Sequence, residues 1–194
     1  MLEIIQGTEK ERQLKVKQLV EKYPFLLPRN IFTDKLPDDY DYTYIKYLEI
    51  PKGWNKLFLQ LCEDIRQPLI DEGYLDNFRL TQVKEKFNEL RIYHTGAPDI
   101  VEDIIRKYEV MAKYVCSHCG RPADYETCEC YIESFCSNCC SKERLAHNCG
   151  SIKPIIFKDS FVLTQYDKTL KKTETNISFR DEWERYIKNL GGLT

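Results

Sequence analysis

The segment 114–150 reads YVCSHCGRPADYETCECYIESFCSNCCSKERLAHNCG, and the rest of the chain is interpreted around it. It contains eight of the nine cysteines and two of the three histidines of a 194-residue sequence. Its outer cysteines form two Cys-x2-Cys pairs separated by 16 residues, which is the spacing of a tetrahedral zinc site. Each pair can direct two thiolates toward one ion, so two pairs supply a complete shell. We therefore predict a Zn²⁺ site with the ligands Cys116, Cys119, Cys136 and Cys139.

The remaining cysteines leave open whether the segment holds one zinc ion or two. One ion would make a simple zinc ribbon. Two ions would make a cross-brace, as in RING-like or B-box-like modules, in which the first and third ligand pairs hold one ion and the second and fourth pairs the other. Both arrangements are closed, whereas a catalytic zinc keeps an open position, so the sequence predicts a structural metal. The second site would use Cys128, Cys130, His147 and Cys149, with Cys140 as an alternate ligand.

The cysteine pattern favours zinc over disulfide bonds. The first residues, MLEIIQGTEKERQ, contain no apolar signal-peptide core, and no run of apolar residues is long enough to span a membrane. The odd number of cysteines and their close pairing also suit a reducing compartment, where thiols stay free to bind metal. Cys62 stands alone in an apolar helical pattern, and we expect it to be a buried small hydrophobic residue.

The composition is that of an ordinary folded protein, with 42% hydrophobic and 31% charged residues. The chain is long enough to bury a substantial core, and its many tyrosines and phenylalanines favour packed structure over disorder. The net charge is −2, and the segment 113–150 is itself slightly acidic. A phosphate backbone favours the opposite sign. The charge therefore weighs against nucleic acid as the main partner.

Hydrophobic periodicity predicts an α+β protein in which small helices and short antiparallel strands pack around a zinc-ribbon or treble-clef-like module. Apolar residues recur at helical spacing in four segments. Helices are expected over 9–22, 54–73, 97–112 and 178–190. Strands are expected over 42–50, 152–157 and 161–166, with the last two forming a hairpin that is followed by a polar loop at 170–175.

The segment 78–93 supports two interpretations. We favour a hairpin with strands at 78–83 and 90–93, because Asn88 suits a turn position with positive φ. The competing interpretation is a helix over 83–90, whose residues include good helix formers. The charged residues of this segment are a candidate binding surface, or else a ladder of salt bridges across the hairpin. They are Lys84, Glu85, Lys86 and Arg91.

Several stretches, in order, carry a resemblance to a known family. They are Gly53-Trp54 followed by Leu57, Leu61-Cys62 and Ile65; the run QVKEKFNELRIY at 82–93; Cys116-x2-Cys119-Gly120; and Cys136-x2-Cys139. Over residues 50–140 the chain resembles a family of small phage and prophage proteins. The hallmarks of that family are a Gly-Trp helix start, a QVKEKFG-x-LRFY-like segment and a following Cys-x2-Cys-Gly knuckle. The resemblance implies a phage-type origin and expression in bacterial cytoplasm, and it brings no specific activity with it.

The chain departs from the family pattern at two places. Asn88 stands where the family usually has glycine, and asparagine is the next-best residue for a positive φ, so a turn at this position survives. The additional cysteines Cys128, Cys130 and Cys149 are not part of the pattern, so the resemblance extends to the first zinc site only.

We divide the chain into an extension at 1–50, an α/β core at 51–112, a zinc module at 113–150, and a hairpin with a helix at 151–194. The closed metal shell and the absence of a glycine-rich phosphate loop or an HExxH helix favour binding over catalysis. We therefore expect a zinc-binding phage-type protein that binds a host bacterial protein, such as a defence or transcription component, and inhibits or redirects it. The alternative is a nucleic-acid-binding zinc ribbon, and a metal-dependent hydrolase or nuclease would need an open zinc site.

Overall fold

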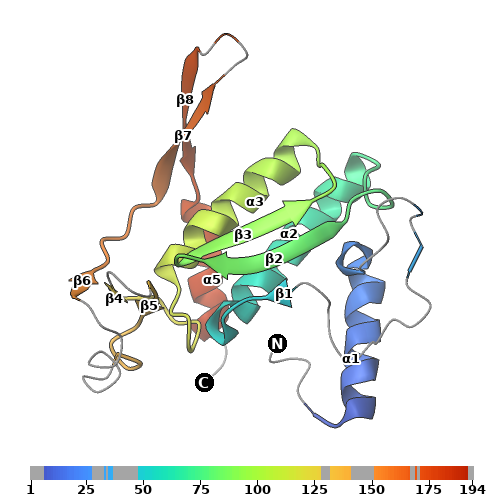
Figure 1. The fold of residues 1–194 in the computed structure, drawn as a ribbon, viewed down its shortest axis with the longest axis horizontal. Coiled ribbons are helices and arrows are strands. Elements are labelled where there is room, and N and C mark those ends of the chain that lie inside the picture. Colours follow the sequence, from blue (N-terminus) through green and yellow to red (C-terminus); the bar gives the residue numbers. More distant parts are fainter. Residues whose placement is uncertain are drawn as a thin grey trace.

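The computed structural model describes residues 7–27, 33, 35–36, 48–127, 132–140, 151–166, 169 and 171–191. Helices and small, mostly antiparallel sheets alternate along the chain, which confirms the predicted α+β class (Figure 1). The elements are α1 (Glu9–Lys22), η2 (Pro24–Leu26), β1 (Leu48–Glu49), η3 (Lys52–Trp54), α2 (Asn55–Asp71), β2 (Leu80–Lys86), β3 (Glu89–His94), α3 (Asp99–Met111), η4 (Ala112–Tyr114), β4 (Tyr125–Thr127), β5 (Ser134–Phe135), β6 (Ile152–Pro154), β7 (Ser160–Tyr166), β8 (Lys172–Ser178) and α5 (Arg180–Gly191).

One hydrophobic core joins residues of α1, α2, α3, α5 and the β2–β3 strands. Figure 1 shows β2 and β3 in front of α2 and α3, so the helices cover one face of the sheet. Helix α2 is the centre of this core, because apolar residues recur every three or four positions along its inward face. Burial of each such side chain stabilises the fold by roughly 1.5–3 kcal/mol. The fully buried residues of α2 are Leu57, Phe58, Leu61, Cys62, Ile65 and Leu69.

Cys62 confirms its prediction as a small buried hydrophobic residue. Its side chain is 0% exposed, and burial raises the pKa of its thiol. A thiol in this state stays protonated and unreactive, so Cys62 belongs to the core and not to a site.

The hairpin predicted at 78–93 is confirmed, and the competing helix over 83–90 is wrong. Strands β2 and β3 are antiparallel, with Lys86 paired to Glu89 across a two-residue turn. Both turn residues have positive φ, 55° at Phe87 and 61° at Asn88, as a type I′ turn requires. Good helix formers in this segment are overridden by the turn and by the apolar alternation that buries Val83 and Leu90. Strand β1 pairs with β2 in parallel and ends before Ile50, and residues 42–47 of the predicted strand 42–50 lie outside the described residues.

The hairpin predicted between 152–157 and 161–166 is wrong. Strand β6 pairs instead with β4, so residues 152–154 belong to the small sheet β5-β4-β6. Strand β7 pairs with β8, which occupies the segment expected to be a polar loop. The sequence of β8, KTETNIS, is exposed on both faces along most of its length, so it lacks the apolar alternation by which a half-buried strand is recognised.

The β7–β8 hairpin extends away from the body of the molecule, and α5 then returns the chain to the core (Figure 1). Phe179 and Tyr186 are buried there, at 0% and 1% exposure. Among the described helices, none combines the length and the apolar character that crossing a membrane requires.

Candidate metal centre

The structure brings together the sulfurs of Cys116, Cys119, Cys136 and Cys139, which all lie within 4.8 Å of one another. The Sγ atoms of Cys119 and Cys136 are 3.5 Å apart. In a tetrahedral Zn²⁺ site with Zn–S bonds of about 2.3 Å, neighbouring sulfurs are about 3.8 Å apart, so the cluster has the size of one such site. Among the residues that the structure describes, no other group of three or more Cys, His, Asp or Glu side chains lies close enough to share an ion.

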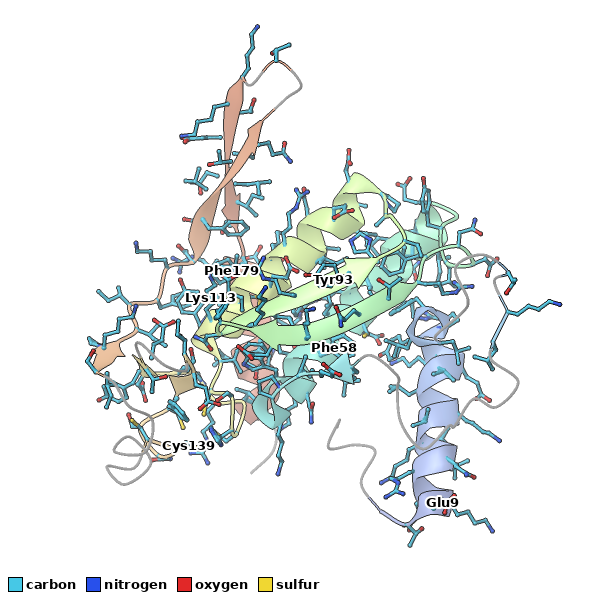
Figure 2. The ribbon with its side chains drawn as sticks, viewed as in Figure 1. Glu9, Phe58, Tyr93, Lys113, Cys139 and Phe179 are labelled. Carbon is cyan, nitrogen blue, oxygen red and sulfur yellow. The ribbon has the colours of Figure 1, made fainter. Side chains whose placement is uncertain are left out.

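Two short loops, one per cysteine pair, present these sulfurs. In the first, the Cys116 carbonyl accepts the Gly120 N–H at 3.0 Å, and Gly120 has a φ of +76° that favours glycine. In the second, the Cys136 carbonyl accepts the N–H groups of both Cys139 and Cys140 at 3.0 Å. The first loop precedes β4 and the second follows β5, and because Tyr125 pairs with Phe135 in the antiparallel ladder, both loops lie at the same end of the β4–β5 pairing, which is a ribbon-like arrangement (Figure 2 shows Cys139 and the neighbouring sulfurs).

The proximity of these sulfurs favours a divalent cation. Burial, followed by the nearby Cys119 sulfur, raises the pKa of Cys139. Four thiolates this close repel one another, and a divalent cation is the partner that offsets the repulsion. Two of the four side chains, Cys116 and Cys136, are also buried, at 0% and 5% exposure. The donor set and its burial therefore fit a structural zinc ion.

The short helix η3, which leads into α2, holds the first loop in place. The Gly53 N–H donates to the Ser117 carbonyl at 2.8 Å, and the Trp54 Nε1–H donates to the Val115 carbonyl at 3.1 Å. From α5, the buried Tyr186 hydroxyl donates to the Gly120 carbonyl at 2.5 Å. The Gly-Trp pair and the first cysteine loop are thus one packing unit, although more than sixty residues separate them in the chain.

The tip of the β2–β3 hairpin packs on the same module. The Asn88 side chain is 2% exposed, and its Nδ2 donates to Ser134 Oγ at 2.7 Å and to Glu126 Oε1 at 3.1 Å. Ser134 in turn donates to the Lys113 carbonyl at 2.8 Å and accepts the Ser117 N–H on its own carbonyl at 2.9 Å. Sequence reasoning recognised Asn88 as a turn residue and missed this second role, for which no local signal exists.

The four candidate ligands of a second ion, Cys128, Cys130, His147 and Cys149, lie outside the described residues. The alternate ligand Cys140 is described and is half-buried, and its sulfur is not part of the four-sulfur group. Whether the chain binds one zinc ion or two stays an open prediction.

The candidate binding residues separate onto the two faces of the β2–β3 hairpin. Glu85 pairs across the strands with the buried Leu90, and its Oε1 accepts the Asn88 N–H at 2.6 Å. Lys84 lies directly opposite Arg91 on the other face, which carries exposed side chains. Lys86 also lies on that face, two residues after Lys84. We call this second face the open face of the sheet.

Two aromatic side chains accompany the charges of the open face. Tyr93 is 47% exposed and has the Lys84 Nζ 5.2 Å from its ring centroid. Phe87, at the turn, is 70% exposed, with the Lys86 Nζ 5.5 Å from its ring centroid. The period-two alternation of the strand could have placed Tyr93 on this face from sequence alone. Figure 2 shows Tyr93 on β3, in front of the helices.

Comparison with protein-family models, curated proteins and solved structures finds no match to this chain. The function has to be inferred from the chain's own residues. A shell of four thiolates leaves no coordination position for water or substrate, so an ion held by these four cysteines would have a structural role. The surfaces that this centre holds in place are therefore the functional candidates.

Proposed function

We propose that this chain is a non-catalytic zinc-binding protein that acts by binding another protein. The observation that carries the proposal is the closed group of four cysteine sulfurs within 4.8 Å of one another. Cys116, Cys119, Cys136 and Cys139 hold one structural Zn²⁺, and the ion stabilises the first loop, on which Gly53 packs, and the β4–β5 pair, on which Asn88 packs.

The open face of the sheet supplies the binding surface. It presents Lys84, Lys86 and Arg91 beside the exposed rings of Tyr93 and Phe87. Aromatic residues and arginine are enriched at protein interfaces, and the positive charge suits an acidic partner. In line with the phage-type resemblance, the partner is a host protein of the bacterial cytoplasm, which the protein inhibits or redirects.

A second candidate is single-stranded nucleic acid bound on the same face. The observation that favours it is the pairing of exposed aromatic rings with lysines, at Lys84–Tyr93 and Lys86–Phe87. Bases stack on such rings while the cations attract the phosphates. This mode of binding weakens steeply as salt increases.

The test is a tagged capture from bacterial lysate, with and without nuclease. We expect a stoichiometric protein band that survives nuclease and is lost in the double variant Lys84→Glu/Lys86→Glu. The matched control is Lys10→Glu/Lys188→Glu, which changes the same charge at two exposed lysines on α1 and α5. Zinc content and thermal unfolding confirm that both variants are folded.

The outcomes separate the candidates. If nuclease treatment abolishes the capture, nucleic acid becomes the favoured partner in place of a protein. Equal capture by both double variants would show that the open face is not the binding surface. Turnover of a substrate by the purified zinc-loaded protein would contradict the non-catalytic proposal.

A further inference from the structure

A cleft of about 290 Å³ borders the open face, between β3, α3 and the start of β7. Its apolar lining comes from β3 and α3, which are consecutive in the chain, and from β7, which is distant from both. Arg91 belongs both to this cleft and to the open face, so the two surfaces are continuous. The apolar side chains of the cleft are Leu90, Val110, Phe161 and Leu163.

Three cationic side chains line the cleft, and one carboxylate lies between two of them. Glu89 pairs with Arg91 on its own strand, and its Oε1 is 2.7 Å from the Lys113 Nζ. Arg106, the third cation, lies 3.6 Å from Asp103 along α3. These ion pairs are partly exposed, so each is weak and can exchange partners. A carboxylate of a binding partner can therefore replace the Glu89 carboxylate beside Arg91 and Lys113.

The other carboxylate of the cleft, Glu109, has a different role. Its Oε1 accepts the Ile92 N–H of β3 at 2.9 Å, and burial raises its pKa. Glu109 thus satisfies a backbone N–H at the edge of β3, and moving its carboxylate away would leave that N–H without its acceptor. Of the two carboxylates in the lining, Glu89 is therefore the one that a partner's acid can replace without exposing a backbone group.

We propose that this cleft receives an acidic segment of the protein partner, with an apolar side chain on the cleft floor and a neighbouring Asp or Glu carboxylate that displaces Glu89 from Arg91 and Lys113. The inference rests on the proposed function and adds to it the place and the chemistry of recognition. An apolar anchor beside a charge pair is the arrangement that gives protein interfaces their affinity and orientation.

Nucleic acid fits the cleft less well. A phosphate backbone offers no apolar side chain for the floor, and the Glu109 carboxylate lies in the lining. The whole chain is also net negative, at −2. Phosphate groups bind best to a broad positively charged surface, whereas the lining of this cleft contains both cationic side chains and carboxylates.

The test measures fluorescence anisotropy of labelled probes with the zinc-loaded protein. The probes are a short peptide of alternating Glu and Leu, a Glu–Ser peptide, a Lys–Leu peptide and an oligothymidylate. We expect the Glu–Leu peptide to bind most tightly. Glu89→Gln should tighten that binding roughly three- to tenfold, because it removes the internal competitor. The matched control is Glu184→Gln, which removes an exposed carboxylate from α5.

Arg106→Glu/Lys113→Glu should weaken Glu–Leu binding about tenfold or more, while Lys10→Glu/Lys188→Glu should not. The proposal is overturned if Glu89→Gln leaves the affinity unchanged or lowers it, if the Glu–Ser peptide binds equally well, or if only the oligothymidylate binds. The lysate capture distinguishes a failure of the cleft proposal from a failure of the proposed protein-binding function. Capture that is lost in Lys84→Glu/Lys86→Glu and intact in Arg106→Glu/Lys113→Glu would leave the proposed function standing and remove the cleft from it.

Discussion

A Cβ atom on Gly53 would lie 2.0 Å from the carbonyl oxygen of Cys116, far closer than real side chains approach. The Gly53 N–H meanwhile donates to the Ser117 carbonyl at 2.8 Å. Only glycine lets η3, which leads into α2, come this near to the first cysteine loop. Two separate parts of the phage-family resemblance, the Gly-Trp pair and the Cys-x2-Cys-Gly knuckle, are therefore in direct contact in this chain.

Replacing Gly53 by alanine should destabilise the protein and weaken its hold on zinc. The added methyl group meets backbone atoms, which cannot rotate away, so the loop has to move. Overpacking of this kind costs about 1–3 kcal/mol or more. Urea unfolding at fixed zinc concentration measures the loss. Gly191→Ala is the matched control, since no atom would lie within 4 Å of its Cβ, and a shift of equal size there would contradict the explanation.

Replacing Asn88 by glycine should cost about 1–2 kcal/mol, because glycine keeps the positive φ and loses the hydrogen bonds to Ser134 and Glu126. Asn88→Ala should cost roughly a further 1 kcal/mol from the strained backbone. Thermal or urea unfolding gives both values. Phe87→Gly separates the two effects, because Phe87 has a similar φ and a side chain that is 70% exposed, so the free energy of unfolding should stay the same or rise. Equal losses at both positions would argue against the docking role of Asn88.

Replacing Cys136 by serine should remove one zinc equivalent from the protein. The site loses a thiolate from a shell of four, and structural zinc in such shells contributes about 10–16 kcal/mol of apparent binding free energy. Metal analysis after dialysis against a weak chelator measures the stoichiometry. Cys62→Ala is the control, since that buried residue lies outside the group of four and should alter stability without altering zinc content. Full zinc content in Cys136→Ser would contradict the assigned ligand set.

Replacing Glu109 by glutamine should leave the protein as stable as the wild type at neutral pH or slightly more stable. The amide oxygen can still accept the Ile92 N–H, and the penalty for a buried charge disappears. Glu109→Ala should cost about 1–3 kcal/mol, because the buried N–H loses its acceptor.

The same residue gives a pH dependence with a definite sign. Burial raises the pKa of Glu109 above its ordinary value of 4.5, so the folded protein binds this proton more tightly than the unfolded chain. The stability that the protonated Glu109 side chain contributes is complete below about pH 4.5, and it is lost as the pH rises through the folded-state pKa. Relative to Glu109→Gln, the wild type should therefore lose free energy of unfolding across this window. The reverse slope in paired urea titrations would contradict the assignment.

Much of the architecture follows from local features of the sequence. The helix at 9–22 begins at a capping box, in which Thr8 and Glu11 bond each other's backbone, and α2 follows an unbroken apolar period. The turn at Asn88 follows from the tolerance of asparagine for positive φ. These features act within one or two turns of chain, so no tertiary knowledge is needed to see them.

Strand pairing at the C-terminal end was predicted incorrectly for a physical reason. The residues of β8 are polar on both faces and carry no apolar alternation, so the sequence predicted the strand at 161–166 but not β8, with which that strand pairs. Strand β6 could pair with its neighbour in the chain or with β4, and in the structure it pairs with β4. Pairing depends on which edges meet after the chain has folded, and local propensity does not contain that information.

The sequence by itself determined the spacing of Cys116, Cys119, Cys136 and Cys139, the helical periods and the hairpin turn, because each depends on neighbouring residues. Only the tertiary structure decided that Gly53 presses on the Cys116 carbonyl, that Asn88 is buried against Ser134, and that Glu89 balances cations from two elements. Those contacts join residues that are distant in the chain. They arise from close packing in three dimensions, where backbone approach, hydrogen-bond satisfaction and charge pairing are settled together.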